Sequence, residues 1–313
     1  MAFRASNIGN DTVIYISIFD RIDSFSFKEI LSSTFMMDGR MDLEKGFLLF
    51  NKVVSLFTSS SVMYLTITST IIILSVAIFF QRYSESSVLS LYLYTTIGVY
   101  FFMITGMRQA LSMSICLFGV KYAEKRKLLR FLLIVFLAAS FHKSAIVFLM
   151  VYWLVNLKLS KKNIWIWLAT TVVSVVFLTK IQDFVNELLG YSYSIEETGN
   201  GYLFLAIMIV LLVLSLLQYK KTIEEKPETI VLFNMQFVCF IFWILRLFTR
   251  SMERPSYYFI FGVLAVIPTV INRFESKSKF IIIYAATVLF AILYFHRLNG
   301  NIIFVPYEFV QMN

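Results

Sequence analysis

The stretch at residues 105–145, TGMRQALSMSICLFGVKYAEKRKLLRFLLIVFLAASFHKSA, decides the fold because a basic loop separates two apolar runs. Its middle, KYAEKRKLLR, holds five Lys or Arg residues. A loop this basic stays in the cytoplasm when its flanking helices cross a membrane. One run leads from Arg108 into the loop and the other leads out of it to His142, so we expect both residues at the outer end of a helix. Ionisable groups at membrane depth are costly, which makes both candidates for function.

The whole chain has the composition of a polytopic membrane protein. Of its 313 residues, 59% are hydrophobic and 15% are charged, whereas a soluble domain has about 25% charged residues. The net charge of +9 does not indicate nucleic-acid binding, because the Lys and Arg residues lie in short loops between apolar segments, where they set topology. We predict one all-α integral-membrane domain over residues 1–313, a polytopic helical bundle.

About ten apolar segments carry this prediction. Several have the ~20 residues that a spanning helix needs, and three are short enough to be tilted, broken or re-entrant (109–121, 128–142 and 144–157). The full set is 62–80, 88–107, 109–121, 128–142, 144–157, 163–180, 202–219, 230–248, 256–272 and 280–296.

Alternation of the loops gives one consistent topology. The loops at 81–87, 121–130, 158–162, 219–228 and 272–279 fall on one side, and each contains Lys or Arg, with several in all but the first. The loop at 181–201 falls on the other side and has Asp183, Glu187, Glu196 and Glu197 but no Lys or Arg. The positive-inside rule therefore places residues 1–61 and the tail at 297–313 outside. Either the segment at 62–80 inserts with its N-terminus out, or an upstream helix is missing.

Cations gather at helix ends on the expected outer face, where the topology rule predicts few. Arg246, Arg250 and Arg254 are four residues apart and share a helix face if the helix at 230–248 continues outward. Pro255 suits the first turn of the next helix. Arginines beside helix N-termini bind phosphate well. The alternative is that these side chains snorkel to the interface.

Other polar residues are candidates on the same face. His142 is followed by Lys143 and by Ser144, which can cap the next helix. His142 could hold a phosphate oxygen, relay a proton, or be structural.

The N-terminal segment adds Arg4, Asp11 and Glu44 as candidates, with solvated loop charges as the alternative. Glu44 precedes a short amphipathic run whose polar face carries Asn51, Lys52 and Ser55, so we expect that run to lie along the membrane interface.

No metal or cofactor site is expected. The two cysteines, Cys116 and Cys239, fall inside apolar runs and are expected in the core. The sequence has two histidines and no CxxC, HExxH, DxD or glycine-rich phosphate loop.

Five stretches in order resemble the EpsG-like branch of the Wzy polysaccharide polymerases. They are FRASNIGNDTVIYISIF (3–19), LEKGFLLFNKVV (43–54), GMRQALSMSICLFGVKYAEKRK (106–127), AASFHKSAIVFL (138–149) and ERPSYYF (253–259). The resemblance covers nearly the whole chain. Members of that family usually have one or two helices before the first of these motifs, whereas here it begins at residue 3.

The resemblance implies a bacterial cytoplasmic-membrane glycosyltransferase of the metal-independent, GT-C-like kind, with its active site outside. Its substrates would be oligosaccharide repeats on undecaprenyl pyrophosphate, and the growing polysaccharide would move onto the sugar end of a new unit. The product would be O-antigen, capsule or exopolysaccharide. Membrane lipids, a flippase and a chain-length regulator of the same pathway would be its partners.

The residues fit such a reaction, because fixed cations stabilise negative charge that grows on a pyrophosphate leaving group. We assign pyrophosphate binding to Arg4, Arg108, Lys143, Arg250 and Arg254. The candidates for the general base are Asp11, Glu44 and His142, and the candidates for stacking on sugars are Tyr257 and Tyr258.

Three other functions remain open from the sequence. A polysaccharide ligase, or another lipid-linked glycosyltransferase, would share these pyrophosphate-binding cations and differ in its acceptor. A flippase would need charge along a path through the membrane, but the positions in the middle of the helices are nearly all apolar. The third is a noncatalytic partner in a glycan-assembly complex.

Overall fold

A computed structural model of the chain describes residues 1–32, 36–37, 41–189, 201–299, 301 and 303–309. The fold is an all-α helical bundle, as predicted. Within the described ranges the strands are two residues each, β1 (Met36–Met37) and β2 (Met41–Asp42). They pair antiparallel, with Met36 opposite Asp42.

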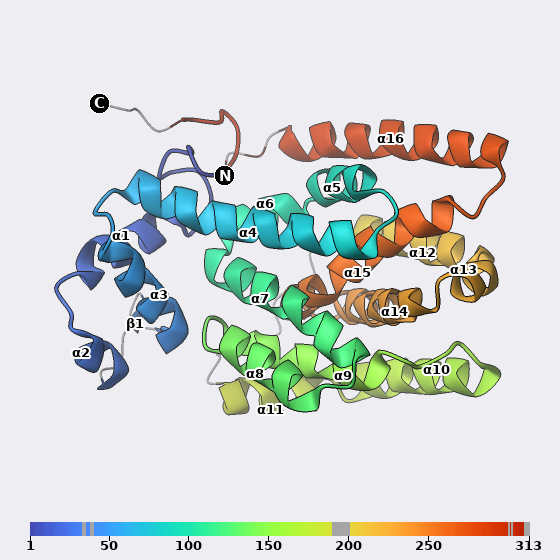
Figure 1. The fold of residues 1–313 in the computed structure, drawn as a ribbon, viewed down its shortest axis with the longest axis horizontal. Coiled ribbons are helices and arrows are strands. Elements are labelled where there is room, and N and C mark those ends of the chain that lie inside the picture. The colour runs from blue at the N-terminus through green and yellow to red at the C-terminus, as the bar shows by residue number, and fades with distance from the viewer. Residues whose placement is uncertain (33–35, 38–40, 190–200, 300, 302, 310–313) are drawn as a thin grey trace.

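The N-terminal part forms three short helices that cover one end of the bundle (Figure 1). They are α1 (Thr12–Ile22), α2 (Phe27–Ser32) and α3 (Lys45–Ser55). Aromatic side chains hold α1 in place: the ring of Tyr15 meets Phe47 of α3 with centroids 5.6 Å apart, and Phe19 stacks on Tyr64 at 4.4 Å. We call this end of the molecule the α1–α3 end.

The polar face of α3 is turned toward α1 and α2. Asn51 is fully buried, and Lys52 Nζ donates to the carbonyl and carboxylate oxygens of Asp23 at 2.9 and 3.1 Å. The exposed apolar side chains here are Val53 on α3 and, in the turn directly after it, Leu56 and Phe57. A position along the membrane interface stays a prediction, but the side that would meet it is this apolar one.

The ten apolar segments all fall on helices. The bundle consists of α4 (Ser61–Tyr83), α5 (Ser87–Thr96), α6 (Val99–Thr105), α7 (Met107–Glu124), α8 (Leu128–Ala139), η1 (Lys143–Leu149), α9 (Met150–Leu154), α10 (Lys161–Val176), α11 (Leu178–Leu189), α12 (Tyr202–Leu217), α13 (Tyr219–Glu225), η2 (Pro227–Thr229), α14 (Ile230–Leu245), η3 (Arg250–Met252), α15 (Glu253–Ile271) and α16 (Ser276–Leu298). The loop predicted at 181–201 is helical as far as Leu189, and Glu196 and Glu197 lie outside the described residues.

Length and composition allow between four and seven membrane spans among the described residues. Four helices qualify alone: Ser61–Tyr83, Pro227–Leu245, Arg250–Ile271 and Ser276–Leu298. Three more spans arise if each bent pair counts once, with bends of 65° between α5 and α6, 74° between α10 and α11, and 59° between α12 and α13. The chain is therefore an integral membrane protein.

The predicted segment at 128–142 ends three residues early, at Ala139. The backbone N–H groups of Ser140 and Phe141 bond back to the last turn of α8, and His142 adopts an extended conformation with φ −157°. The 3-10 helix η1 then begins at Lys143. His142 therefore lies in a turn between two short apolar helices, outside both of them.

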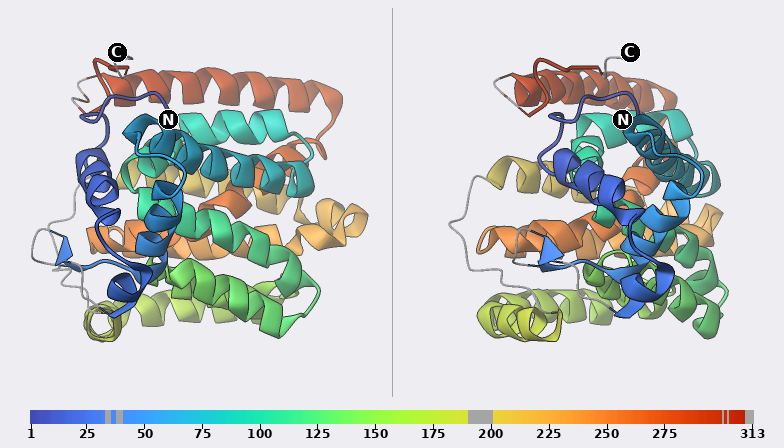
Figure 2. Two further views of the ribbon diagram at one scale, coloured as in Figure 1. Left: turned by 60° about the vertical axis from the view of Figure 1, so that its left-hand side comes forward. Right: turned by 90° about the vertical axis from the view of Figure 1, so that its left-hand side faces the viewer.

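The bundle has a buried central helix and a peripheral one. Most residues of the apolar stretch within Arg250–Ile271, which includes α15, are buried, whereas almost none of the apolar residues of α16 are. Figure 2 shows α16 along the outer edge of the bundle. Gly262 lets α14 and α15 approach closely, because a Cβ there would lie 2.4 Å from the Cβ of Met235.

The helix ends gather in two groups. The first residues of the chain lie near the α1–α3 end in Figure 1, where Arg4 pairs with Phe309, and α13 with the turns joining α4 to α5 and α15 to α16 lies at the opposite end, which we call the α13 end. The loops predicted to be cytoplasmic at 81–87, 219–228 and 272–279 all fall at the α13 end. Three of the five loops predicted to be cytoplasmic therefore lie at one end of the bundle, and which end faces the cytoplasm stays a prediction.

Candidate active site

Four helices begin beside one another at the α1–α3 end. Their first residues are Lys45 in α3, Met107 in α7, Lys143 in η1 and Glu253 in α15. The start of a helix carries N–H groups without intrahelical partners and a partial positive charge. Most of the residues singled out from the sequence lie at these four starts.

Glu44 joins three of the helix starts. It precedes the first residue of α3, and its Oε2 accepts from Arg108 Nη1 of α7 at 2.5 Å. Its Oε1 accepts from the backbone N–H of Lys143 at 3.2 Å, where η1 begins. The side chains of Arg108 and Glu44 are 7% and 4% exposed. A buried carboxylate thus neutralises the buried guanidinium and one helix terminus together.

Tyr15 and Asp11 extend this pair toward α1. Tyr15 lies within hydrogen-bonding range of Arg108, and its hydroxyl donates to Asp11 Oδ2 at 3.4 Å. Burial, with the Asp11 carboxylate adding to it and Arg108 opposing it, raises the pKa of Tyr15 to about 12. The hydroxyl therefore keeps its proton at neutral pH.

His142 lies on the other side of the Arg108–Glu44 pair. It is 5% exposed, and its Nδ1 is 2.7 Å from Ser144 Oγ. Ser144 was predicted to cap the next helix, but the N-cap is His142 itself, and the Ser144 hydroxyl bonds to side chains. Burial, together with the charges of Arg108, Arg254 and Lys143, holds the pKa of His142 well below its usual range.

Arg254 is the exposed cation of the group. It lies in the first turn of α15, followed by Pro255 as predicted. Its carbonyl accepts from Gln109 Nε2 at 2.8 Å, which ties the start of α15 to the start of α7 beside Arg108. Lys143 is half-buried. Arg108, Arg254 and Lys143 all lie within electrostatic range of His142.

Arg4 is close to this group but is bound to other atoms. It is 2% exposed, and its guanidinium donates to the carbonyls of Met1 and Ile104, at 2.5 and 3.3 Å, and to Thr12 Oγ1 at 3.3 Å. These bonds fasten the N-terminal segment to the break between α6 and α7. In this structure the Arg4 guanidinium binds backbone carbonyls and does not face an open anion-binding site.

The predicted arginine row on one helix face is wrong. Helix α14 ends at Leu245, so Arg246, Arg250 and Arg254 do not share a helix. Arg246 turns back to Glu253, with Nε 3.1 Å from Oε2. Arg250 is exposed in η3, and among the described residues no hydrogen bond or ion pair joins its side chain to Arg108 or His142.

The two candidate sugar-binding tyrosines are both in the core. Tyr257 stacks on Phe102 with centroids 4.1 Å apart and donates to Glu253 Oε1 at 2.9 Å. Tyr258 is 1% exposed, and its hydroxyl lies 3.0 Å from Ser144 Oγ. A sugar could stack on either ring only after the surrounding core opened, so the part of Tyr258 that reaches the site is its hydroxyl.

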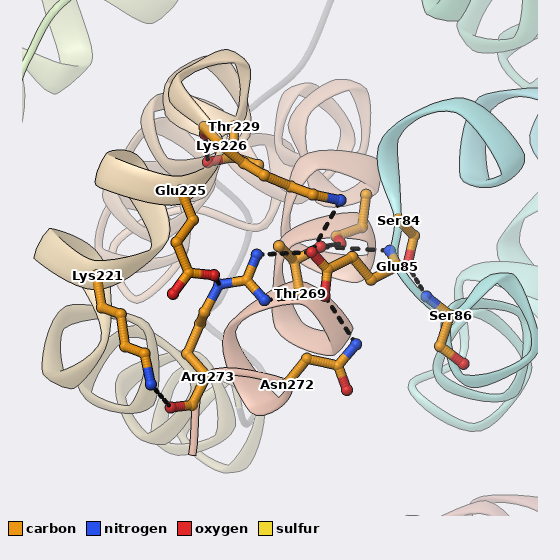
Figure 3. Close-up of polar contacts among 11 residues, drawn as sticks. Ser84, Glu85, Ser86, Lys221, Glu225, Lys226, Thr229, Thr269, Asn272 and Arg273 are labelled. Atoms are coloured by element: carbon orange, nitrogen blue, oxygen red, sulfur yellow. Dashed lines mark hydrogen bonds and ion pairs between the residues drawn. The ribbon is translucent and has the colours of Figure 1, made fainter. Parts of the chain in front are cut away.

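A second charged cluster lies at the α13 end (Figure 3). Glu85 points between three donors from other elements: Arg273 at 2.6 and 3.1 Å, Lys226 at 2.8 Å and Asn272 at 2.8 Å. Arg273 also pairs with Glu225 at 2.9 Å. Burial raises the pKa of Glu85, but these hydrogen bonds outweigh it and hold the pKa at about 2.

This cluster joins helices. Its charges are matched within the protein, and it links the α4–α5 turn to α13 and to the end of α15. A cavity of about 590 Å³ opens beside it between α5, α15 and α16, with Glu85, Asn272 and Lys279 at its polar end. It lies at the opposite end of the bundle from Arg108, so it does not belong to the candidate active site.

The site as described contains no metal-binding group: within the described part of the chain, no three His, Cys, Asp or Glu side chains gather closely enough to hold an ion. Metal independence stays a prediction.

The amino-acid sequence was compared with models of known protein families. The model of the EpsG family matches residues 1–309. The chain belongs to the EpsG family. No curated protein and no solved structure matches it significantly. EpsG membership supports a polysaccharide-polymerase type of role, and the helical bundle is the membrane scaffold on which that role would be carried out.

Proposed function

We propose that this EpsG-family protein polymerises lipid-linked oligosaccharide repeat units at the outer face of the bacterial cytoplasmic membrane. It transfers the growing glycan from undecaprenyl pyrophosphate to the sugar end of a new repeat unit. The observation that carries the proposal is the meeting of four helix starts with Arg108, Lys143 and Arg254 at one end of the bundle.

The electrostatics of this end suit a pyrophosphate leaving group. Negative charge grows on the leaving oxygen in the transition state, and fixed cations that are already in place stabilise it without reorganisation. Arg254 and Lys143 are accessible enough to meet the pyrophosphate, whereas Arg108 is buried and paired with Glu44, so its role is to hold Glu44 at the start of η1 beside these two cations. The apolar outer surfaces of the helices would hold the prenyl chains.

The acceptor hydroxyl needs a base, and two candidates lie beside the cations. Glu44 is committed to Arg108 and to the start of η1. His142 is neutral at neutral pH and sits in the turn next to Lys143. We therefore assign the base to His142, with Asp11 and Tyr15 supporting Arg108 from α1.

A substitution series in cells tests the proposal. Arg254→Ala removes an exposed cation, so the protein should fold and reach normal levels while polymerisation falls by about 10²–10³-fold, the cost of losing one transition-state donor. Lys277→Ala removes an exposed cation at the α13 end and is the matched control. Lipid-linked glycans are then compared by size.

The size pattern separates the alternatives. Accumulation of single repeats in the Arg254 variant supports a polymerase, whereas long chains that remain unattached would indicate a ligase. Normal long chains in both variants would show that Arg254 does not bind the pyrophosphate during polymerisation.

A further inference from the structure

A chain of four hydrogen bonds runs from His142 into the core. His142 Nδ1 is 2.7 Å from Ser144 Oγ, which is 3.0 Å from the hydroxyl of Tyr258. That hydroxyl is 3.2 Å from Ser112 Oγ on α7, and Ser112 donates to the carbonyl of Ala138 at 2.8 Å. The same carbonyl accepts from the backbone N–H of His142 at 3.1 Å, so both ends of the chain meet at the last turn of α8.

The carbonyl fixes the direction of every bond in the chain. A carbonyl only accepts, so the single hydroxyl proton of Ser112 is donated to the carbonyl of Ala138. The Ser112 oxygen must then accept from the hydroxyl of Tyr258. Tyr258 has then used its proton and must accept from Ser144. Ser144 has in turn used its own, so His142 Nδ1 must be the donor.

Burial favours this one set of donor and acceptor roles over its reverse. Ser112 is fully buried, Tyr258 is 1% exposed and His142 is 5% exposed. Ser144 is half-buried, so bulk water is excluded from the Ser112 and Tyr258 hydroxyls rather than from every link, and reversing either of their bonds would leave a buried hydroxyl without an acceptor. The ring is neutral, because burial and three nearby cations keep the pKa of His142 low. A neutral imidazole has one proton, and the chain places it on Nδ1.

We propose that Ser112, Tyr258 and Ser144 are positioning residues that hold His142 in the Nδ1-protonated tautomer and so reserve Nε2 for the acceptor hydroxyl. The inference rests on the proposed function for the identity of that hydroxyl. In the transfer step, the proton of the acceptor sugar moves to Nε2 while its oxygen bonds to the anomeric carbon of the growing chain. The bond from that carbon to the pyrophosphate breaks, and its electron pair leaves with undecaprenyl pyrophosphate.

The tautomer can be measured without substrate. The chain has two histidines, and His296 is exposed on α16, so His296→Gln leaves His142 as the only ¹⁵N-histidine signal. In the labelled full-length protein in lipid, we expect the proton on Nδ1, the nitrogen bonded to Cγ. A proton on Nε2 would overturn the proposal.

Two tyrosine variants test the chain itself. In Tyr258→Phe, Ser144 loses its acceptor and is free to donate to Nδ1, so we expect the Nε2-protonated form to appear. Tyr257→Phe removes a neighbouring hydroxyl that bonds to Glu253 instead, and the tautomer should not change. An unchanged tautomer in Tyr258→Phe, in protein with normal helical content, would overturn the proposal.

Kinetics then separate positioning from packing. With lipid-linked repeats, Tyr258→Phe should lower kcat by between about 10-fold and about 10⁴-fold, the range for a base held in the wrong tautomer, with KM nearly unchanged. A shifted tautomer with normal kcat would refute His142 as the base. A wild-type protein with the expected tautomer but without polymerase activity would refute the proposed function and leave the tautomer assignment standing.

Discussion

At the scale of single residues, the buried pair of Arg108 and Glu44 is the feature on which the site depends. A buried ion pair is costly to break, because removing one partner leaves the other charged and desolvated. Here Glu44 also accepts from the start of η1, so the pair serves both stability and the position of His142. A single substitution of Arg108 therefore mixes two effects.

A double substitution separates these effects. Arg108→Ala should lower the free energy of unfolding by about 3–5 kcal/mol and abolish polymer. Arg108→Met combined with Glu44→Leu removes both charges and should restore most of the stability, measured as the melting temperature in detergent, while polymer stays absent. Recovery of polymer together with stability would mean that the pair is only structural.

Sequence reasoning found the charged residues of the site, assigned Ser144 and Tyr258 other roles, and missed Ser112. Arg108 and His142 stand out because they interrupt apolar runs, and Glu44 because it precedes an amphipathic run. Ser112 and Tyr258 are 146 residues apart in sequence, and a serine or tyrosine in an apolar helix gives no signal of its partner. Their role depends on the docking of α7, α8 and α15, which periodicity does not specify.

At the scale of elements, the docking of α3 on the turn after α8 sets the geometry of the site. The backbone N–H of Gly46 donates to the carbonyl of Ser140 at 2.8 Å. A Cβ on Gly46 would lie 2.1 Å from Ser140 Oγ and 2.6 Å from its carbonyl oxygen. This close approach explains why a glycine follows Glu44 by two residues.

Gly46→Ala should push α3 away from the turn and lengthen the Glu44 contacts. We expect a loss of stability of about 1–3 kcal/mol, the range for overpacking, and a large loss of polymer. Gly201→Ala is the control, because a Cβ there meets Arg246 only at an ordinary 3.5 Å. The melting temperature and the polymer size distribution of both variants are the readout, and equal values would contradict this account of α3.

The helices themselves follow well from the sequence, but their ends do not. Each apolar segment predicted a helix, whereas the ends of α8 at Ala139 and of α14 at Leu245 came earlier than the apolar runs suggested. Hydrophobicity continues past these points, and backbone bonds in the turns end the helices. The early end of α14 is what separates Arg246, Arg250 and Arg254.

At the scale of the whole molecule, charged clusters lie at both ends of the bundle. The positive-inside rule predicts that the α1–α3 end faces outside and the α13 end faces the cytoplasm. Labelling tests this directly. In protein lacking Cys116 and Cys239, a cysteine at position 254 should react with an impermeant thiol reagent from outside, and one at position 277 only after the membrane is opened. The reverse pattern, or labelling of both from one side, would contradict the topology.

The Glu85 cluster gives a pH dependence of the whole fold. Its folded pKa of about 2 lies below the unfolded value near 4.3, so its stabilisation is fully present above about pH 4.3 and is lost as pH falls through about 2. Glu85→Gln should lower the melting temperature at neutral pH and flatten its decline between pH 5 and 2. Exposed Glu275→Gln at the same end should keep the wild-type curve, and a Glu85 variant that also keeps it would show that the cluster adds no stability.

The most direct test of the central claim is polymerisation by the purified protein in vesicles. Undecaprenyl-pyrophosphate-linked repeat units are supplied with a metal chelator, and glycan length is followed over time. The account predicts long chains and released undecaprenyl pyrophosphate from the wild-type protein and from Lys277→Ala, and single repeats from Arg254→Ala. Chains of equal length from Arg254→Ala, or a wild-type protein that polymerises only when metal is restored, would contradict it.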